Sequence, residues 1–201
     1  SEFDNEIRKD HNVVCGCDEA GRGPLAGDVF AAAVIFDKDT VIEGINDSKK
    51  LTAKKREELF DEIMEKAVDF SIQTATVEEI EDINILNAAM LAMKRAVEDM
   101  DTKPDVCLID GNKTPEGLEC PAIAVVKGDA KSQAVAAASI LAKVARDRYM
   151  EQMAEQYPEY RFEKHKGYGT KLHYQMIDQY GPCGIHRMSF LKKYYAKKNG
   201  H

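Results

Sequence analysis

Short apolar runs alternate with charged segments of helical periodicity along most of this 201-residue chain. The runs are rich in Val, Ile and Ala, and residues 29–36 are apolar almost throughout, which is typical of a strand buried on both faces of a sheet. Residues 70–75 instead alternate between apolar and polar side chains, as in a strand with one exposed face. The predicted strands are 13–17, 29–36, 70–75, 105–110 and 122–126.

Capping residues and prolines delimit the predicted helices. Thr52 is a good N-cap for a charged amphipathic segment, and the sequence from Thr76 to Glu79 has the form of a capping box. Pro158 ends the longest helical segment. The predicted helices are 53–66, 76–100, 130–157 and 171–179. Three early strands and two later ones that alternate with helices predict one mixed α/β sheet, flanked by helices, in a single domain spanning 1–201.

The composition is that of a folded protein without membrane segments. Hydrophobic residues make up 44% of the chain, and no apolar run approaches the roughly 18 residues that a membrane span requires. The N-terminal residues are too polar for a signal peptide, so we expect a cytoplasmic protein. The five cysteines form no CxxC pair, and we expect them to be reduced core residues rather than a metal or redox site.

The charge is distributed unevenly. The formal net charge is −7, which by itself argues against a nucleic-acid partner. Residues 161–201, however, contain nine Lys and Arg residues against two acidic residues, so the first 160 residues carry a net charge of −14. A basic C-terminal quarter could follow a phosphate backbone while the acidic body holds metal. The alternative is a solvated basic helix face.

Acidic residues follow three of the predicted strands. Asp18 and Glu19 end the first strand, Asp110 ends the fourth, and Asp129 follows the fifth. If these strand ends share one edge of the sheet, the four carboxylates converge, and their repulsion favours a bound divalent cation. Oxygen ligands select hard ions such as Mg²⁺ or Mn²⁺, and two such ions support phosphodiester hydrolysis without a protein nucleophile.

Each acid also has a structural interpretation that the sequence leaves open. Asp129 precedes a long helix and could be its N-cap, and Asp110 precedes a glycine and could form a turn. Asp18 and Glu19 could lie on the surface. Their shared position after buried strands favours the metal site.

A Gly-Arg-Gly turn at 21–23 directly follows the first pair of acids. Gly21 and Gly23 have no Cβ, so their backbone can take positive φ and bring its N–H groups close to another molecule. A second glycine-rich loop, 165–170, contains Tyr168, which could alternatively be a half-buried loop anchor. Both loops are candidates for substrate binding.

Several motifs resemble those of the ribonuclease HII family, the type 2 ribonucleases H. The strongest is segment 18–27, Asp-Glu-Ala-Gly-Arg-Gly-Pro-Leu-Ala-Gly. Similar motifs follow in the family's order at 44–49, 109–111, 125–129, 137–144 and 165–168. The resemblance spans roughly residues 14–190. One departure is Asp28, which stands where the family commonly has proline and adds an acid near the substrate loop.

The resemblance implies a ribonuclease H-like fold with a basic C-terminal helical segment, about 160–201, that binds substrate. It implies hydrolysis of the RNA strand of RNA–DNA hybrids and cleavage on the 5′ side of ribonucleotides embedded in duplex DNA, leaving a 3′-hydroxyl and a 5′-phosphate. The implied cofactor is Mg²⁺ or Mn²⁺, with two ions. The implied partners are the RNA–DNA hybrid and the ribonucleotide-containing DNA duplex, and we expect a monomer that acts in ribonucleotide removal from DNA.

The family's functional residues carry over by motif. The metal-binding catalytic acids are then Asp18, Glu19, Asp110 and Asp129. Gly21, Arg22 and Gly23 are expected to contact the 2′-hydroxyl and backbone at the RNA-to-DNA junction, and Tyr168 is expected to stack on the deoxyribose that follows. Further phosphate contacts are expected from Asn46, Ser48, Lys49, Ser139, Lys143 and Arg146.

Two other functions remain open. A DNA nuclease with the same fold would use the same acids on DNA without ribose, but the Gly-Arg-Gly turn and Tyr168 argue against it. A catalytically silent hybrid-binding protein would have no use for four acids at strand ends.

Overall fold

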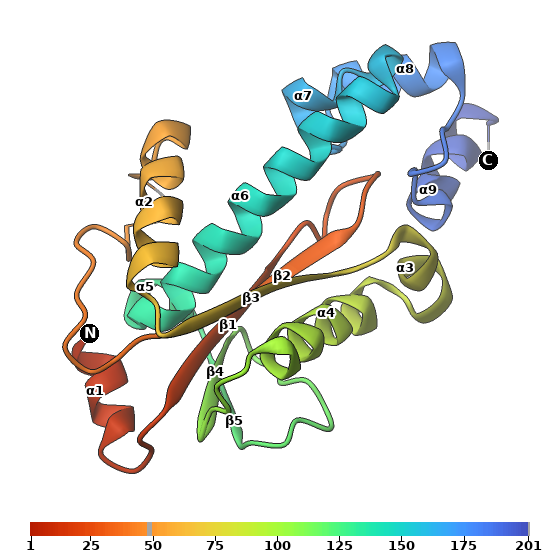
Figure 1. Cartoon of the computed structure of the whole chain (residues 1–201). Helices are drawn as coiled ribbons and strands as arrows, with labels where there is room; N and C mark the ends of the chain where they lie inside the picture. Colours follow the sequence, from red (N-terminus) through yellow and green to blue (C-terminus); the bar gives the residue numbers. More distant parts are fainter. Residues whose placement is uncertain (48–49, 201) are drawn as a thin grey trace.

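The computed structural model describes residues 1–47 and 50–200, which form a five-stranded mixed sheet with helices on both faces (Figure 1). The strand order is β3-β2-β1-β4-β5. The first three strands form an antiparallel meander, whereas β4 and β5 run parallel to β1. The strands are β1 (Val14–Ala20), β2 (Val29–Ile35), β3 (Asp69–Ala75), β4 (Val106–Asp110) and β5 (Ala122–Val125). All five predicted strands are therefore confirmed.

The helices precede, connect and follow these strands. They are α1 (Glu2–Arg8), α2 (Ala53–Lys66), α3 (Val77–Ile83), α4 (Ile85–Asp99), α5 (Gly128–Lys131), α6 (Gln133–Gln156), α7 (Phe162–His165), α8 (Lys171–Tyr180) and α9 (Met188–Lys198). Helix α1 was not predicted, whereas α9 lies within the C-terminal segment, about 160–201, that was expected to be helical. In the residues that the structure describes, no helix is both long enough and apolar enough to cross a membrane.

Side-chain alternation along the strands divides the core between the two faces of the sheet. Cys17 and Ile109 pack on the face covered by α4. Leu108 packs on the opposite face, against Val135 of α6. Gly16 of β1 lets α6 pack directly on the strand. A Cβ at this position would lie only 2.2 Å from the carbonyl carbon of Ala134, so no larger residue fits there. All five cysteines are free, as expected, but only Cys15, Cys17 and Cys107 are buried, whereas Cys120 and Cys183 are partly exposed.

The predicted helix over 76–100 is in fact two helices. Asn84 interrupts it with a φ of 72° and a ψ of 168°, a backbone conformation that is strained for any residue other than glycine. The Asn84 side chain accepts a hydrogen bond from the Asn87 N–H and so caps α4. The helical periodicity continues through both segments, which is why the sequence does not reveal the break.

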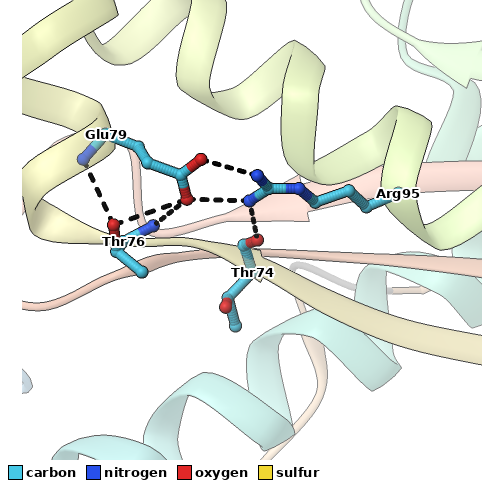
Figure 2. A network of polar contacts seen from close by, with 4 residues as sticks. All are labelled: Thr74, Thr76, Glu79 and Arg95. Carbon is cyan, nitrogen blue, oxygen red and sulfur yellow. Dashed lines mark hydrogen bonds and ion pairs between the residues drawn. The ribbon is translucent and has the colours of Figure 1, made fainter.

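The predicted capping box at the start of α3 is confirmed. The Thr76 hydroxyl accepts a hydrogen bond from the Glu79 N–H, and Oε1 of Glu79 accepts one from the Thr76 N–H (Figure 2). Arg95 of α4 forms an ion pair with the same carboxylate at 2.6 Å and donates to the Thr74 carbonyl of β3. These contacts fix α3 and α4 against the end of β3. The neighbouring guanidinium lowers the pKa of Glu79 to about 2.

The predicted helix over 130–157 begins later than expected. Ser132 is the N-cap of α6, and its hydroxyl accepts a hydrogen bond from the Val135 N–H. Asp129 therefore lies neither at the end of a strand nor at the N-cap of the long helix. It lies in the first turn of the separate short helix α5.

Candidate active site

Asp18 and Asp110 lie beside each other on neighbouring parallel strands. The last parallel pair of the β1–β4 ladder joins Cys17 to Ile109, so the next residues along the two strands are the two aspartates. By alternation, both lie on the α6 face of the sheet. The sequence places Asp18 at a strand end, but β1 continues to Ala20 because β2 still pairs with it there. The parallel ladder, not β1 itself, ends at the acids.

The Asp18 carboxylate is buried at 6% exposure. Its Oδ1 accepts a hydrogen bond from the Glu19 N–H at 2.8 Å. Burial raises the pKa of Asp18 well above its usual range, and the nearby carboxylates of Glu19 and Asp110 add to the rise. The two like charges are therefore close enough to oppose ionisation of Asp18.

Glu19 reaches the cluster from the other face of the sheet. It lines a pocket of about 370 Å³ together with Asp110 and Asn84 of the α3–α4 junction. Arg22 lies in the same pocket, 3.4 Å from the Glu19 carboxylate. A carboxylate from each face thus borders one opening.

Helix α5 brings Asp129 to the cluster. The Gly128 N–H donates a hydrogen bond of 2.6 Å to Oδ1 of Asp110, which ties α5 to the end of β4. Burial raises the pKa of Asp110, the Gly128 N–H opposes this effect, and the charges of Asp129 and Glu19 add to the rise. All four predicted acids are therefore electrostatic neighbours.

The described residues contain no group of three or more His, Cys, Asp or Glu side chains already arranged to hold a metal ion. The composition of the site nevertheless fits a hard divalent cation, because all its charged ligands would be carboxylate oxygens. The pKa values of Asp18 and Asp110 are raised by burial first and then by the neighbouring carboxylates, and a bound cation would oppose both effects.

The loop after β1 reaches the second glycine-rich loop. A Cβ at Gly23 would lie 3.8 Å from Cε1 of Tyr168, and the Tyr168 side chain is 43% exposed. The ring also faces the guanidinium of Arg146, with Cζ 5.8 Å from the ring centroid. An exposed aromatic face therefore stands beside the exposed backbone of Arg22 and Gly23.

Comparison with known proteins identifies the family to which the chain belongs. A family model described as Ribonuclease HII matches residues 15–193. The Ribonuclease HII of Caldicellulosiruptor saccharolyticus is 54% identical over 189 residues, covering 94% of this chain and 92% of that protein. The chain belongs to the ribonuclease HII family. It is accordingly an endoribonuclease, a hydrolytic enzyme.

Solved structures confirm the expected ribonuclease H-like fold. The ribonuclease H2 of Pyrococcus horikoshii OT3 matches with a TM-score of 0.77 at 29% identity, over 94% of this chain and 100% of that chain. Bst-RNase HIII, crystallised in complex with Mn²⁺, shares the fold with a TM-score of 0.69 at 16% identity, over 93% of this chain and 70% of that chain.

Among the residues expected to contact phosphate, Asn46 and Arg146 already have hydrogen-bond partners within the protein. The side-chain amide of Asn46 donates to the Asp129 carbonyl at 2.8 Å and to the Ser132 carbonyl at 3.1 Å. Arg146 is only 2% exposed, and its guanidinium donates to backbone carbonyls. The expectation that Arg146 touches phosphate is therefore wrong for this structure, because burial keeps it from the surface.

The other expected contacts stay predictions. Lys143 is partly exposed and lies 3.7 Å from the Asp147 carboxylate on α6, and Ser139 is partly buried one turn earlier. Ser48 and Lys49 lie outside the described residues.

Sequence reasoning missed the buried polar groups that hold the two loops of this ribonuclease HII. Arg187 is fully buried and donates to carbonyls of the loop after β1. The Nε2 atoms of His186 and His173 share a hydrogen bond of 2.9 Å, and Nδ1 of His173 donates a hydrogen bond of 2.9 Å to the Tyr168 carbonyl. Burial lowers the pKa of both rings to about 4, so both are neutral at pH 7. In the sequence these residues are only isolated polar residues in a basic segment.

Proposed function

We propose that this enzyme hydrolyses the RNA strand of RNA–DNA hybrids and cuts duplex DNA on the 5′ side of an embedded ribonucleotide, leaving a 3′-hydroxyl and a 5′-phosphate. The observation that carries the proposal is a buried carboxylate cluster beside a backbone loop and an exposed tyrosine. The cluster suits phosphodiester hydrolysis, and the loop and Tyr168 suit recognition of a sugar. Removal of ribonucleotides from DNA is the corresponding role.

Asp18, Glu19, Asp110 and Asp129 are the proposed ligands of Mg²⁺ or Mn²⁺. When bound, such ions activate water and stabilise the leaving oxygen of an in-line displacement. The protein itself positions the ligands: β1 and β4 hold the carboxylates of Asp18 and Asp110 side by side, and the hydrogen bond from the Gly128 N–H to Asp110 attaches α5 to them. The complex of Bst-RNase HIII with Mn²⁺ supports an ion of this kind on this fold.

The segment of about 160–201 is proposed to bind the duplex that flanks the cut. Lys171, Lys193 and Lys197 line a groove of about 670 Å³ between α8 and α9, together with aromatic side chains that include Tyr174. Within the described residues, none of these lysines has a carboxylate at ion-pair distance, unlike Lys198, which pairs with Asp178 at 2.7 Å. Unpaired ammonium groups over aromatic surface suit a nucleic-acid backbone.

Cleavage mapping tests the proposal. End-labelled duplexes with none, one or four ribonucleotides are incubated with Mg²⁺ or Mn²⁺, and the cut position is read at nucleotide resolution. We expect a cut 5′ of the ribonucleotide in the wild type and none in Asp110→Asn, while Asp61→Asn, an exposed change on α2, acts as the wild type. Cleavage of the ribose-free duplex would favour the DNA nuclease, and binding without metal-dependent cleavage would favour the silent protein.

A further inference from the structure

The backbone of the loop after β1 is held mostly by its carbonyl groups, while the N–H groups of Leu25, Gly27 and Asp28 also donate hydrogen bonds. Between positions 21 and 28, seven carbonyl oxygens accept hydrogen bonds from outside the loop. The Arg187 side chain supplies four of these contacts, and its backbone N–H supplies a fifth, to Leu25. Arg146 supplies the other two, to Ala26 and Asp28.

The two guanidinium groups lie side by side beneath the loop without an ion-pair partner. Arg187 and Arg146 are 0% and 2% exposed, and no Asp or Glu of the described residues lies within ion-pair distance of either. Asp28 is the acid whose charge acts on both, but its Oδ1 accepts from the N–H of Val77. Burial and the neighbouring Arg146 lower the pKa of Arg187 to about 9, so it remains a cation at pH 7. A buried cation without an ion-pair partner is costly, and the hydrogen bonds to the loop carbonyls are what offsets that cost here.

The hydrogen bonds to the loop carbonyls also determine the direction in which the loop N–H groups point. The peptide bond is planar and trans, so its N–H points opposite to its carbonyl. The Gly21 and Arg22 carbonyls both point to Nη atoms of Arg187, at 2.7 and 3.0 Å. The N–H groups of Arg22 and Gly23 therefore point away from Arg187, toward the surface. Both residues are exposed, and neither N–H has a hydrogen-bond acceptor within the described residues.

We propose that Arg187, together with Arg146, is a positioning residue for substrate recognition: it holds the loop carbonyls inward so that the Arg22 and Gly23 N–H groups donate to an oxygen of the substrate's sugar–phosphate backbone. The inference rests on the proposed function. The two buried positive charges behind these N–H groups also favour an acceptor that carries negative charge.

The glycine at position 21 belongs to the same arrangement. Its φ is +94°, and a Cβ there would lie 2.1 Å from Nε of Arg146. Glycine is thus required at this position for packing over the guanidinium as well as for its backbone conformation.

Arg187→Lys tests the inference, because lysine keeps the charge but cannot donate to four carbonyls at once. On the single-ribonucleotide duplex we expect kcat/KM to fall by about 10- to 100-fold, corresponding to the loss of about two hydrogen bonds. The matched control is Leu59→Ala, a buried change on α2 that lowers Tm without touching the loop. Its kcat/KM should equal that of the wild type at a temperature where both are folded.

A second measurement starts from the unmodified protein, so its first outcome does not depend on the fold of a variant. The backbone amide signals of Arg22 and Gly23 are followed by NMR as the same duplex is added in EDTA, which prevents cleavage. We expect both signals to shift in the wild type and to shift less in Arg187→Lys. Unchanged amide signals in the wild type, or Arg187→Lys with the kcat/KM of Leu59→Ala, would overturn the inference. Failure of the wild type to cut any ribonucleotide-containing duplex would instead overturn the proposed function.

Discussion

Asp18→Asn should make the metal-free protein more stable while removing its response to metal. The folded-state pKa of Asp18 is raised by burial and by Glu19 and Asp110, so the ionised form destabilises the fold at every pH above that pKa. This cost is absent at a pH below the unfolded-state pKa. Asparagine has nearly the same shape, carries no charge, and still offers Oδ1 to the Glu19 N–H. The substitution therefore removes repulsion without opening a cavity.

The magnitude follows from linkage. Each pKa unit of the rise costs about 1.4 kcal/mol at neutral pH, and 1 kcal/mol moves Tm by about 2–4 °C in a domain of this size. Asp18→Asn should thus raise Tm in EDTA by about 3–6 °C for each unit of the shift. A cation at about 100 times its Kd adds about 2.7 kcal/mol, so the wild type should gain about 5–11 °C with Mg²⁺ or Mn²⁺.

The assay is thermal unfolding at pH 7 in EDTA and then with excess Mg²⁺ or Mn²⁺. Wild type and Asp61→Asn should melt together in both conditions, and Asp18→Asn should melt higher in EDTA and gain little from metal. If Asp18→Asn melts below the wild type in EDTA, the repulsion among the acids is not what limits stability there. Equal gains from metal in all three proteins would place the cation elsewhere.

Three further outcomes are expected. Duplex binding should weaken steeply between about 50 and 200 mM salt, with the logarithm of the binding constant falling against the logarithm of salt concentration by about 0.9 per phosphate contacted. A salt-independent Kd would remove the α8–α9 groove from the interface. Tyr168→Phe should keep most of kcat/KM on the single-ribonucleotide duplex, whereas Tyr168→Ala should lose about 1–3 kcal/mol of stacking; equal losses would indicate a role for the hydroxyl. The free energy of unfolding should fall as pH drops from about 6.5 to 4, because the pKa of His173 and of His186 is lowered to about 4; the fall is at most about 3 kcal/mol per ring. Urea unfolding of His186→Gln should show a shallower fall, and an unchanged pH profile would contradict that assignment.

The sequence predicts the sheet well because its strands are buried runs whose signal is local. It predicts helix interruptions poorly. Asn84 breaks a helix through a positive φ that the periodicity of the sequence does not reveal. The N-cap of α6 is Ser132 rather than Asp129, because Asp129 belongs to the separate short helix α5 that precedes α6 in the chain. The helical periodicity of the sequence continues unchanged across both helix breaks, so it does not reveal them.

The candidate site divides in the same way. The four acids could be proposed from their places after strands, and the structure makes them electrostatic neighbours. The role of Arg187 could not be predicted, because its carbonyl partners lie at least 160 positions away in the chain. For Arg146 the family resemblance implied a phosphate contact at the surface, whereas tertiary packing buries the side chain.

The dependence of the loop after β1 on Arg187 also sets an order of events during synthesis. The strands that carry Asp18 and Asp110 and the helix that carries Asp129 are translated well before residue 187. The side chain that holds the Gly21, Arg22, Pro24 and Gly27 carbonyls emerges from the ribosome only after all of these elements. A nascent chain can therefore assemble its carboxylate cluster before the loop after β1 has a fixed shape, and under the proposed role of this loop the selection of a ribonucleotide would follow the assembly of the cluster.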